Sequence, residues 1–137
     1  MTEEQIIDYL KYRMKKGEAT YASISRGSGY HAKTINNWLS LKTKITLDGL
    51  ESILSVFDEK PVVKDRDCKI HFDILEYLPE GIKGHEKEVY GMFAQQRYGK
   101  DNIKKWVKRE HGIKVYMLVD ILDIIGAELL IIKKAGK

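Results

Sequence analysis

The chain has one cysteine and two prolines among its 137 residues, and it lacks a long run of uncharged apolar residues. The single cysteine, Cys68, excludes a disulfide within the chain and fits a reducing compartment. A transmembrane helix would need an uncharged apolar run of about eighteen residues, so none is expected. The start, MTEEQIIDYLKYR, is acidic and amphipathic, unlike a signal peptide. We therefore expect a cytoplasmic protein with no membrane contact.

Groupings typical of catalytic and metal sites are also missing. The four histidines are scattered, without metal-ligand spacing relative to Cys68. Asp120 and Asp123 lie three apart on an expected helix, with no base, nucleophile or glycine-rich loop near them, so we interpret them as solvent-facing. We expect no cofactor, no metal and no enzymatic activity. The 43% of hydrophobic residues indicates a globular chain rather than a disordered one.

What the sequence does contain is an internal repeat. Residues 35–45 read INNWLSLKTKI and residues 103–113 read IKKWVKREHGI, an offset of 68 residues. The same offset aligns residues 3–69 with the rest of the chain without a gap. It superposes Trp38 on Trp106 and Leu50 on Leu118. The sequence therefore predicts a tandem duplication, with a first domain over 1–64, a second over 70–137, and a charged linker over about 60–69.

Apolar spacing predicts four to five short helices in each copy and an all-α fold class. In the first copy Thr20 and Thr46 are candidate N-caps of the second and fourth helices, and the third helix is expected over about 31–39. In the second copy Pro79 should end the first helix near Leu78. The apolar ends PVV and LLII could each add a short β-strand.

Residues 24–39, ISRGSGYHAKTINNWL, resemble the helix–turn–helix of lambda-repressor-like transcription regulators. Ile24 and Ser25 stand for that family's Leu-Ala pair, Gly29 begins the turn, and Ile35 and Trp38 match its core positions on the recognition helix. The likeness covers nearly all of the first copy and, more weakly, the second. It implies a tandem pair of helix–turn–helix domains that bind double-stranded DNA and regulate transcription, as bacterial or phage regulators do.

The outer face of the recognition helix would enter the major groove. The candidate base-reading residues are Ala32, Lys33, Asn36 and Asn37 in the first copy, and Lys100, Asp101, Lys104 and Lys105 in the second. Amides can read adenine, whereas lysines bind guanine or phosphate. The first set therefore favours base reading and the second favours phosphate contact.

Positive charge gathers around both motifs. Residues 26–44 have four basic and no acidic residues, and residues 97–114 have seven basic and two acidic ones. Of a net charge of +4, these windows carry +9, which leaves −5 for the rest of the chain. This distribution favours a polyanionic partner. The candidate phosphate-binding residues are Thr20, Arg26, His31, Lys42, Lys44, Arg97, Lys108, Arg109 and Lys114.

Two hypotheses follow. In the first, the chain is a single-chain pseudo-dimer that binds an asymmetric DNA site, and its apolar ends pair as strands between the copies or between two chains of a homodimer. In the second, the chain is an adaptor or antitoxin-like protein whose second copy serves for packing or docking. Arg97 in place of Gly29 in the turn sets the second copy apart from the first.

Overall fold

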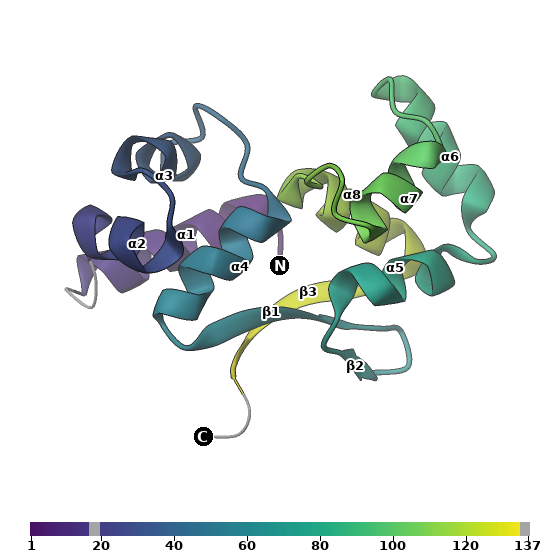
Figure 1. Ribbon diagram of the computed structural model, residues 1–137. Helices are drawn as coiled ribbons and strands as arrows, with labels where there is room; N and C mark the ends of the chain where they lie inside the picture. Colours follow the sequence, from purple (N-terminus) through teal and green to yellow (C-terminus); the bar gives the residue numbers. More distant parts are fainter. Residues whose placement is uncertain (17–19, 135–137) are drawn as a thin grey trace.

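The computed structural model describes residues 1–16 and 20–134, which form eight helices and a three-stranded antiparallel sheet (Figure 1). The first copy contains α1 (Glu3–Lys15), α2 (Tyr21–Ser28), α3 (Ala32–Leu39), α4 (Leu47–Val56) and β1 (Glu59–Lys64). The second copy contains β2 (Ile70–His71), α5 (Ile74–Ile82), α6 (Glu86–Gln95), α7 (Asp101–Val107), α8 (Val115–Ile125) and β3 (Glu128–Lys133).

The predicted all-α class is wrong because β1 pairs with both β2 and β3 in the order β2-β1-β3. Strands β1 and β3 are each six residues long and pair along their full length, from Glu59 opposite Lys133 to Lys64 opposite Glu128. β1 and β3 fall on the apolar ends PVV and LLII, where the sequence predicted that a short strand could form, but their union with β2 in one sheet makes the fold mixed rather than all-α. The expected linker is also ordered, since its first half is part of β1 and residues 65–69 connect β1 to β2.

Hydroxyl side chains begin two helices of the first copy where the sequence predicted. Thr20 accepts a hydrogen bond from the Ser23 N–H at 3.1 Å, and Thr46 accepts one from the Gly49 N–H at 3.0 Å. Each satisfies a backbone donor that the helix itself cannot pair.

The first helix of the second copy runs further than predicted. α5 continues through Pro79 to Ile82, so its expected end near Leu78 is wrong. Pro79 removes a single N–H from the helix, and Ile82 is buried with 2% of its surface exposed. That burial favours the last turn despite the proline.

An approximate two-fold axis relates the two copies. The Leu47 N–H donates to the Ile113 carbonyl at 2.8 Å, and the Val115 N–H donates to the Ile45 carbonyl at 2.9 Å. Ile45 and Ile113 are equivalent positions in the repeat, as are Leu47 and Val115. Each copy therefore donates to the other at the same place, which is the pattern of a two-fold symmetric interface.

The sheet obeys the same symmetry. In the β1–β3 ladder Val62 lies opposite Leu130, and these two residues are again equivalent positions of the repeat. The apolar ends thus pair with each other within the chain. Pairing of these ends between two chains stays a prediction.

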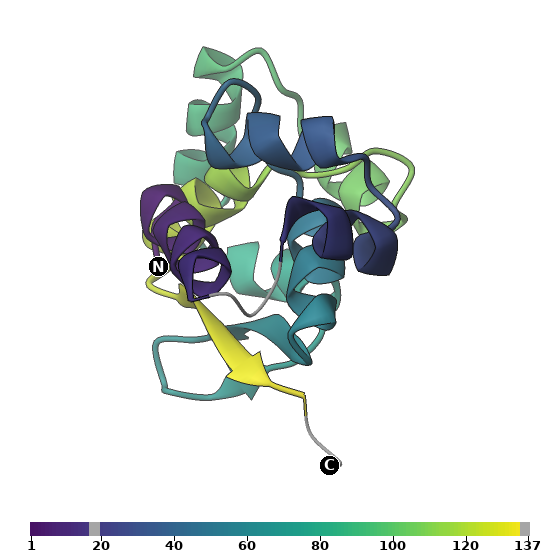
Figure 2. The same ribbon diagram turned by 90° about the vertical axis from the view of Figure 1, so that its left-hand side faces the viewer.

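A continuous hydrophobic core joins the copies. It includes Leu10, Ile35 and Leu50 of the first copy and Leu78 and Leu118 of the second, each at most 1% exposed. Figures 1 and 2 show the helices on one side of the sheet, with α3 and α7 both in the part of the molecule away from it. The fold therefore holds the two predicted recognition helices on the same side.

Candidate nucleic-acid interface

The first helix–turn–helix is held by hydrogen bonds and ring packing around its turn. Gly29 ends α2 in the left-handed conformation, with φ +83°. The Ser25 hydroxyl, unusual for the resembled motif, donates to the Tyr30 carbonyl at 2.6 Å. The Tyr30 ring meets Trp38 edge-on at 4.9 Å between centroids. These contacts fix the angle at which α3 leaves the turn.

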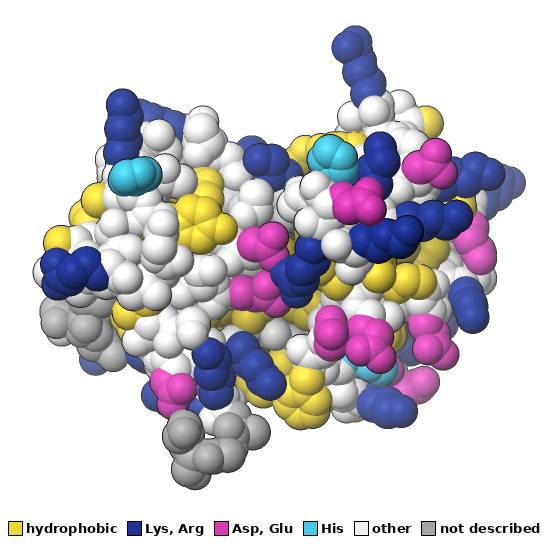
Figure 3. Space-filling model, in the orientation of Figure 1, with side chains coloured by type: hydrophobic (Ala, Val, Ile, Leu, Met, Phe, Trp, Pro, Cys, Tyr) yellow, Lys and Arg dark blue, Asp and Glu magenta, His cyan; other side chains and the backbone are white. Residues whose placement is uncertain are grey.

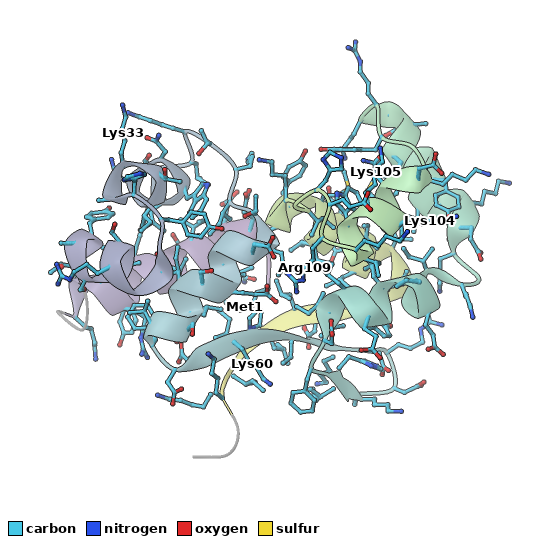
Figure 4. All side chains as sticks on the ribbon, viewed as in Figure 1. Met1, Lys33, Lys60, Lys104, Lys105 and Arg109 are labelled. Atoms are coloured by element: carbon cyan, nitrogen blue, oxygen red, sulfur yellow. The ribbon has the colours of Figure 1, made fainter. Side chains whose placement is uncertain are left out.

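This arrangement turns the predicted reading face of α3 outward. Ile35 is fully buried and Trp38 is 6% exposed on the inner face. Ala32, Lys33 and Asn36 are exposed, and Asn37 is half-buried. Figure 4 shows the Lys33 side chain pointing away from the body of the protein. Three of the four predicted base-reading side chains of the first copy are therefore accessible.

The predicted phosphate-binding residues of the first copy differ in their solvent exposure and in the polar contacts they already make. Arg26, His31 and Lys42 are exposed. Thr20 is exposed but already caps α2. The Lys44 ammonium lies 3.3 Å from the Glu3 carboxylate, so a phosphate would have to compete with that carboxylate.

The backbone of the second helix–turn–helix follows the same course as that of the first, but different side chains pack around its turn. Arg97 replaces Gly29 and also adopts a left-handed conformation, with φ +63°. Trp106 packs edge-on against Phe93 at 5.5 Å and Tyr98 at 5.7 Å between ring centroids. A side chain can occupy this turn only with backbone strain, because its Cβ crowds the neighbouring carbonyl.

Lysines make the face of α7 more basic than that of α3. Lys100, Asp101, Lys104 and Lys105 are all exposed, as are Arg97 and Lys108. In Figure 3 basic side chains gather over α6 and α7, and acidic ones lie between the two copies. These exposed residues give one part of the second copy a charged surface.

Arg109 has a different environment from the other predicted phosphate contacts. Its guanidinium forms ion pairs with Asp48 and, at 3.3 Å, with Glu51, both on α4 of the first copy. Burial raises the pKa of Glu51 above its usual value, and Arg109 partly offsets that rise. Figure 4 places Arg109 between the two halves, so it bridges them. A phosphate at Arg109 would have to displace these carboxylates.

Lys114 lies at the two-fold axis. Its backbone forms a bridge with Thr46, the equivalent residue of the first copy, and it directly precedes α8. Its side chain is half-buried. Lys114 therefore lies between the two halves of the molecule and not on α3 or α7.

The sequence interpretation missed an apolar hollow between α5 and α7, here called the α5–α7 hollow. Its volume is about 410 Å³. It is lined by Pro79, Ile82, Tyr90, Lys100, Asp101, Ile103, Lys104, Val107 and Lys108. The signal available in the sequence was Pro79, whose counterpart Lys11 belongs to a longer helix, α1.

No protein-family model, curated protein or solved structure matches this chain. Within the described residues, the helices are all too short or too polar to cross a membrane. The same residues contain no group of three or more histidine, cysteine, aspartate or glutamate side chains arranged to hold a metal ion.

Proposed function

We propose that the chain binds double-stranded DNA in a sequence-specific manner and acts as a transcription regulator, with its two helix–turn–helix motifs working as a single-chain pseudo-dimer. The observation that carries the proposal is the reciprocal pairing of Leu47 with Ile113 and Val115 with Ile45. Dimeric helix–turn–helix proteins set two recognition helices about a two-fold axis in the same way, so that each meets one half-site.

Charge and exposure support the proposal. The windows around α3 and α7 hold eleven of the 24 basic residues and two of the 20 acidic ones. Lys33 and Asn36 on α3 and Lys105 on α7 are exposed to solvent. A basic surface on helices that also present amide groups suits both phosphate contact and base reading.

The two half-sites should differ in kind. α3 offers Asn36 and Asn37, whereas the equivalent positions of α7 are Lys104 and Lys105. Amides discriminate between bases, and lysines at these positions contact phosphates at any sequence. The first half-site should therefore be sharply defined and the second loosely defined.

Selection of binding sites from a random duplex pool tests the proposal. We expect one defined half-site and a second, weaker preference about one helical turn away. Affinity for the selected site should fall as salt rises, with a log–log slope of about −0.9 for each phosphate contacted. Recovery of no common sequence, together with an affinity that salt leaves unchanged, would refute DNA binding.

A further inference from the structure

The α5–α7 hollow lies beside the inner face of α7, which is more exposed than the equivalent face of α3. Leu39 at the end of α3 is 2% exposed, whereas its counterpart Val107 is half-buried. Ile103 is 7% exposed and its counterpart Ile35 is fully buried. The apolar face of α7 is thus more exposed than the same face of α3, chiefly at Val107.

The floor of the hollow is apolar and its size suits a bound side chain or short segment. Pro79 and Ile82 of α5 face Ile103 and Val107 of α7, and the Tyr90 ring completes the lining. The volume of about 410 Å³ lies within the range of roughly 300–1,000 Å³ typical of ligand pockets. Apolar lining of this kind favours a protein segment over a nucleic acid backbone, which has no large apolar group to insert.

The rim is positive. Lys100, Lys104 and Lys108 recur every fourth residue along α7, so they form a row of about 12 Å at 1.5 Å per residue. Asp101 is the one acidic residue among those that line the hollow. Among the described residues neither Lys104 nor Lys108 has an ion-pair partner. Both lysines could therefore form ion pairs with carboxylates of a bound partner.

From this combination we infer that the α5–α7 hollow is a docking site for a short acidic, amphipathic segment of a partner protein. Apolar side chains of the segment would enter between Ile82 and Val107. Carboxylates beside them would pair with Lys104 and its neighbours in the row. Helical segments commonly bind apolar grooves through residues spaced by three and four. Lys100, Asp101, Lys104 and Lys108 belong both to this hollow and to the residues predicted to contact DNA, so the segment and DNA would compete for this part of α7. The inference itself rests on the apolar lining between α5 and α7 and is tested in the absence of DNA.

A labelled helical peptide with leucines on one face and glutamates beside them is a suitable probe. We expect it to shift the methyl resonances of Ile82, Ile103 and Val107 in the full chain. A matched peptide with lysine at every glutamate should bind at least ~10-fold more weakly, which corresponds to about 1.4 kcal/mol. Equal affinity for both peptides, or shifts confined to other parts of the chain, would overturn the inference.

Neighbouring residues of α7 provide matched variants. Lys104→Glu should weaken binding of the acidic peptide at least ~10-fold, whereas Lys105→Glu, which is outside the lining of the hollow, should change it less than ~3-fold. Figure 4 shows both lysines on α7. Equal losses in the two variants would mean general charge attraction and would reject the site.

The apolar contribution needs its own variant. Val107→Lys adds positive charge, so it should weaken binding only if the segment enters the apolar floor. Helical circular dichroism and the methyl spectrum of the variant check that it folds. Undiminished binding by Val107→Lys would overturn the inference. So would methyl shifts at Ile82 and Val107 that duplex DNA produces and the acidic peptide does not, and that result would assign the surface to nucleic acid.

Discussion

Gly29 and Arg97, at equivalent positions of the repeat, are different residue types in the same backbone conformation. Both have positive φ, +83° and +63°. Glycine adopts this conformation freely, whereas a residue with a Cβ is strained there. A Cβ at Gly29 would meet no atom within 4 Å, so the backbone alone penalises substitution.

Exchanging the residue type at these turns should change stability in opposite directions. We expect Arg97→Gly to raise the free energy of unfolding by about 0.5–1 kcal/mol and Gly29→Ala to lower it by about 1 kcal/mol. Urea denaturation measures both. Gly99→Ala is the control, because Gly99 has open space and no positive φ, and it should be neutral or slightly stabilising. A loss of stability in Arg97→Gly would contradict the strain argument.

On the proposed function, Lys33 and Asn36 of α3 should read bases, whereas Lys42, in the segment after α3, should hold a phosphate. Asn36→Ala and Lys33→Ala should reduce the ratio of affinities for selected and random DNA, by about 1–3 kcal/mol for a lost base contact. Lys42→Ala should weaken both affinities alike. Fluorescence anisotropy with both duplexes measures the ratio, and Lys11→Ala on α1 is the control. Identical behaviour of all three variants would mean that α3 does not read bases.

Among the elements, the β1–β2 connection is organised by one carboxylate. Asp65 accepts hydrogen bonds from the backbone N–H groups of Asp67 and Lys69 at 2.9 and 3.0 Å. Its other oxygen lies 2.8 Å from His71 Nε2, and the His71 ring stacks on Tyr77. The hydrogen bond to His71, with support from the two amides, lowers the pKa of Asp65 below its usual 3.8.

This pairing predicts a pH dependence. A lowered pKa means that the contribution of Asp65 to stability is present above pH 3.8 and is lost as the pH falls through the folded value. His71→Phe keeps a ring against Tyr77 but removes the hydrogen bond, so the Asp65 pKa should rise toward 3.8. Carboxyl ¹³C titration measures this. Lys69→Ala retains its backbone N–H and should leave the pKa nearly unchanged; an unaltered pKa in His71→Phe would exclude the proposed cause.

How far the sequence predicted the elements depended on the range of the interactions involved. Thr20 and Thr46 mark helix starts by bonding to the backbone three residues away, and such local signals could be read directly. Pairing of the apolar ends as strands between the copies was one of the sequence hypotheses, and Val62 opposite Leu130 confirms it. The sequence did not predict β2 or the α5–α7 hollow, because each depends on segments that meet only in the folded chain.

For the molecule as a whole, the common core predicts that the copies unfold together. The two tryptophans report on one copy each, with Trp38 6% and Trp106 3% exposed. In protein labelled with 5-fluorotryptophan, both ¹⁹F signals should change over the same range of urea concentration, as a two-state transition requires. Two separate transitions would show that the copies are independent domains.

The same cooperativity should extend to substitutions at the axis. Val62 is fully buried opposite Leu130, so Val62→Ala should lower the free energy of unfolding by about 1–2.5 kcal/mol. Both ¹⁹F signals should shift to lower urea by the same amount, although the change lies in the first copy. A shift of the Trp38 signal alone would contradict coupling through β1 and β3.

Because β1 and β3 pair within one chain, the paired state of the two copies does not depend on protein concentration. A regulator assembled from two separate chains loses its paired form on dilution, and its occupancy then rises steeply with concentration. Here the two partners are tethered by one chain, so their encounter is intramolecular and independent of the amount of protein. On the proposed function, a DNA site would fill hyperbolically, in simple proportion to protein at low occupancy. A cell could therefore keep such a protein at a few copies without losing its paired state.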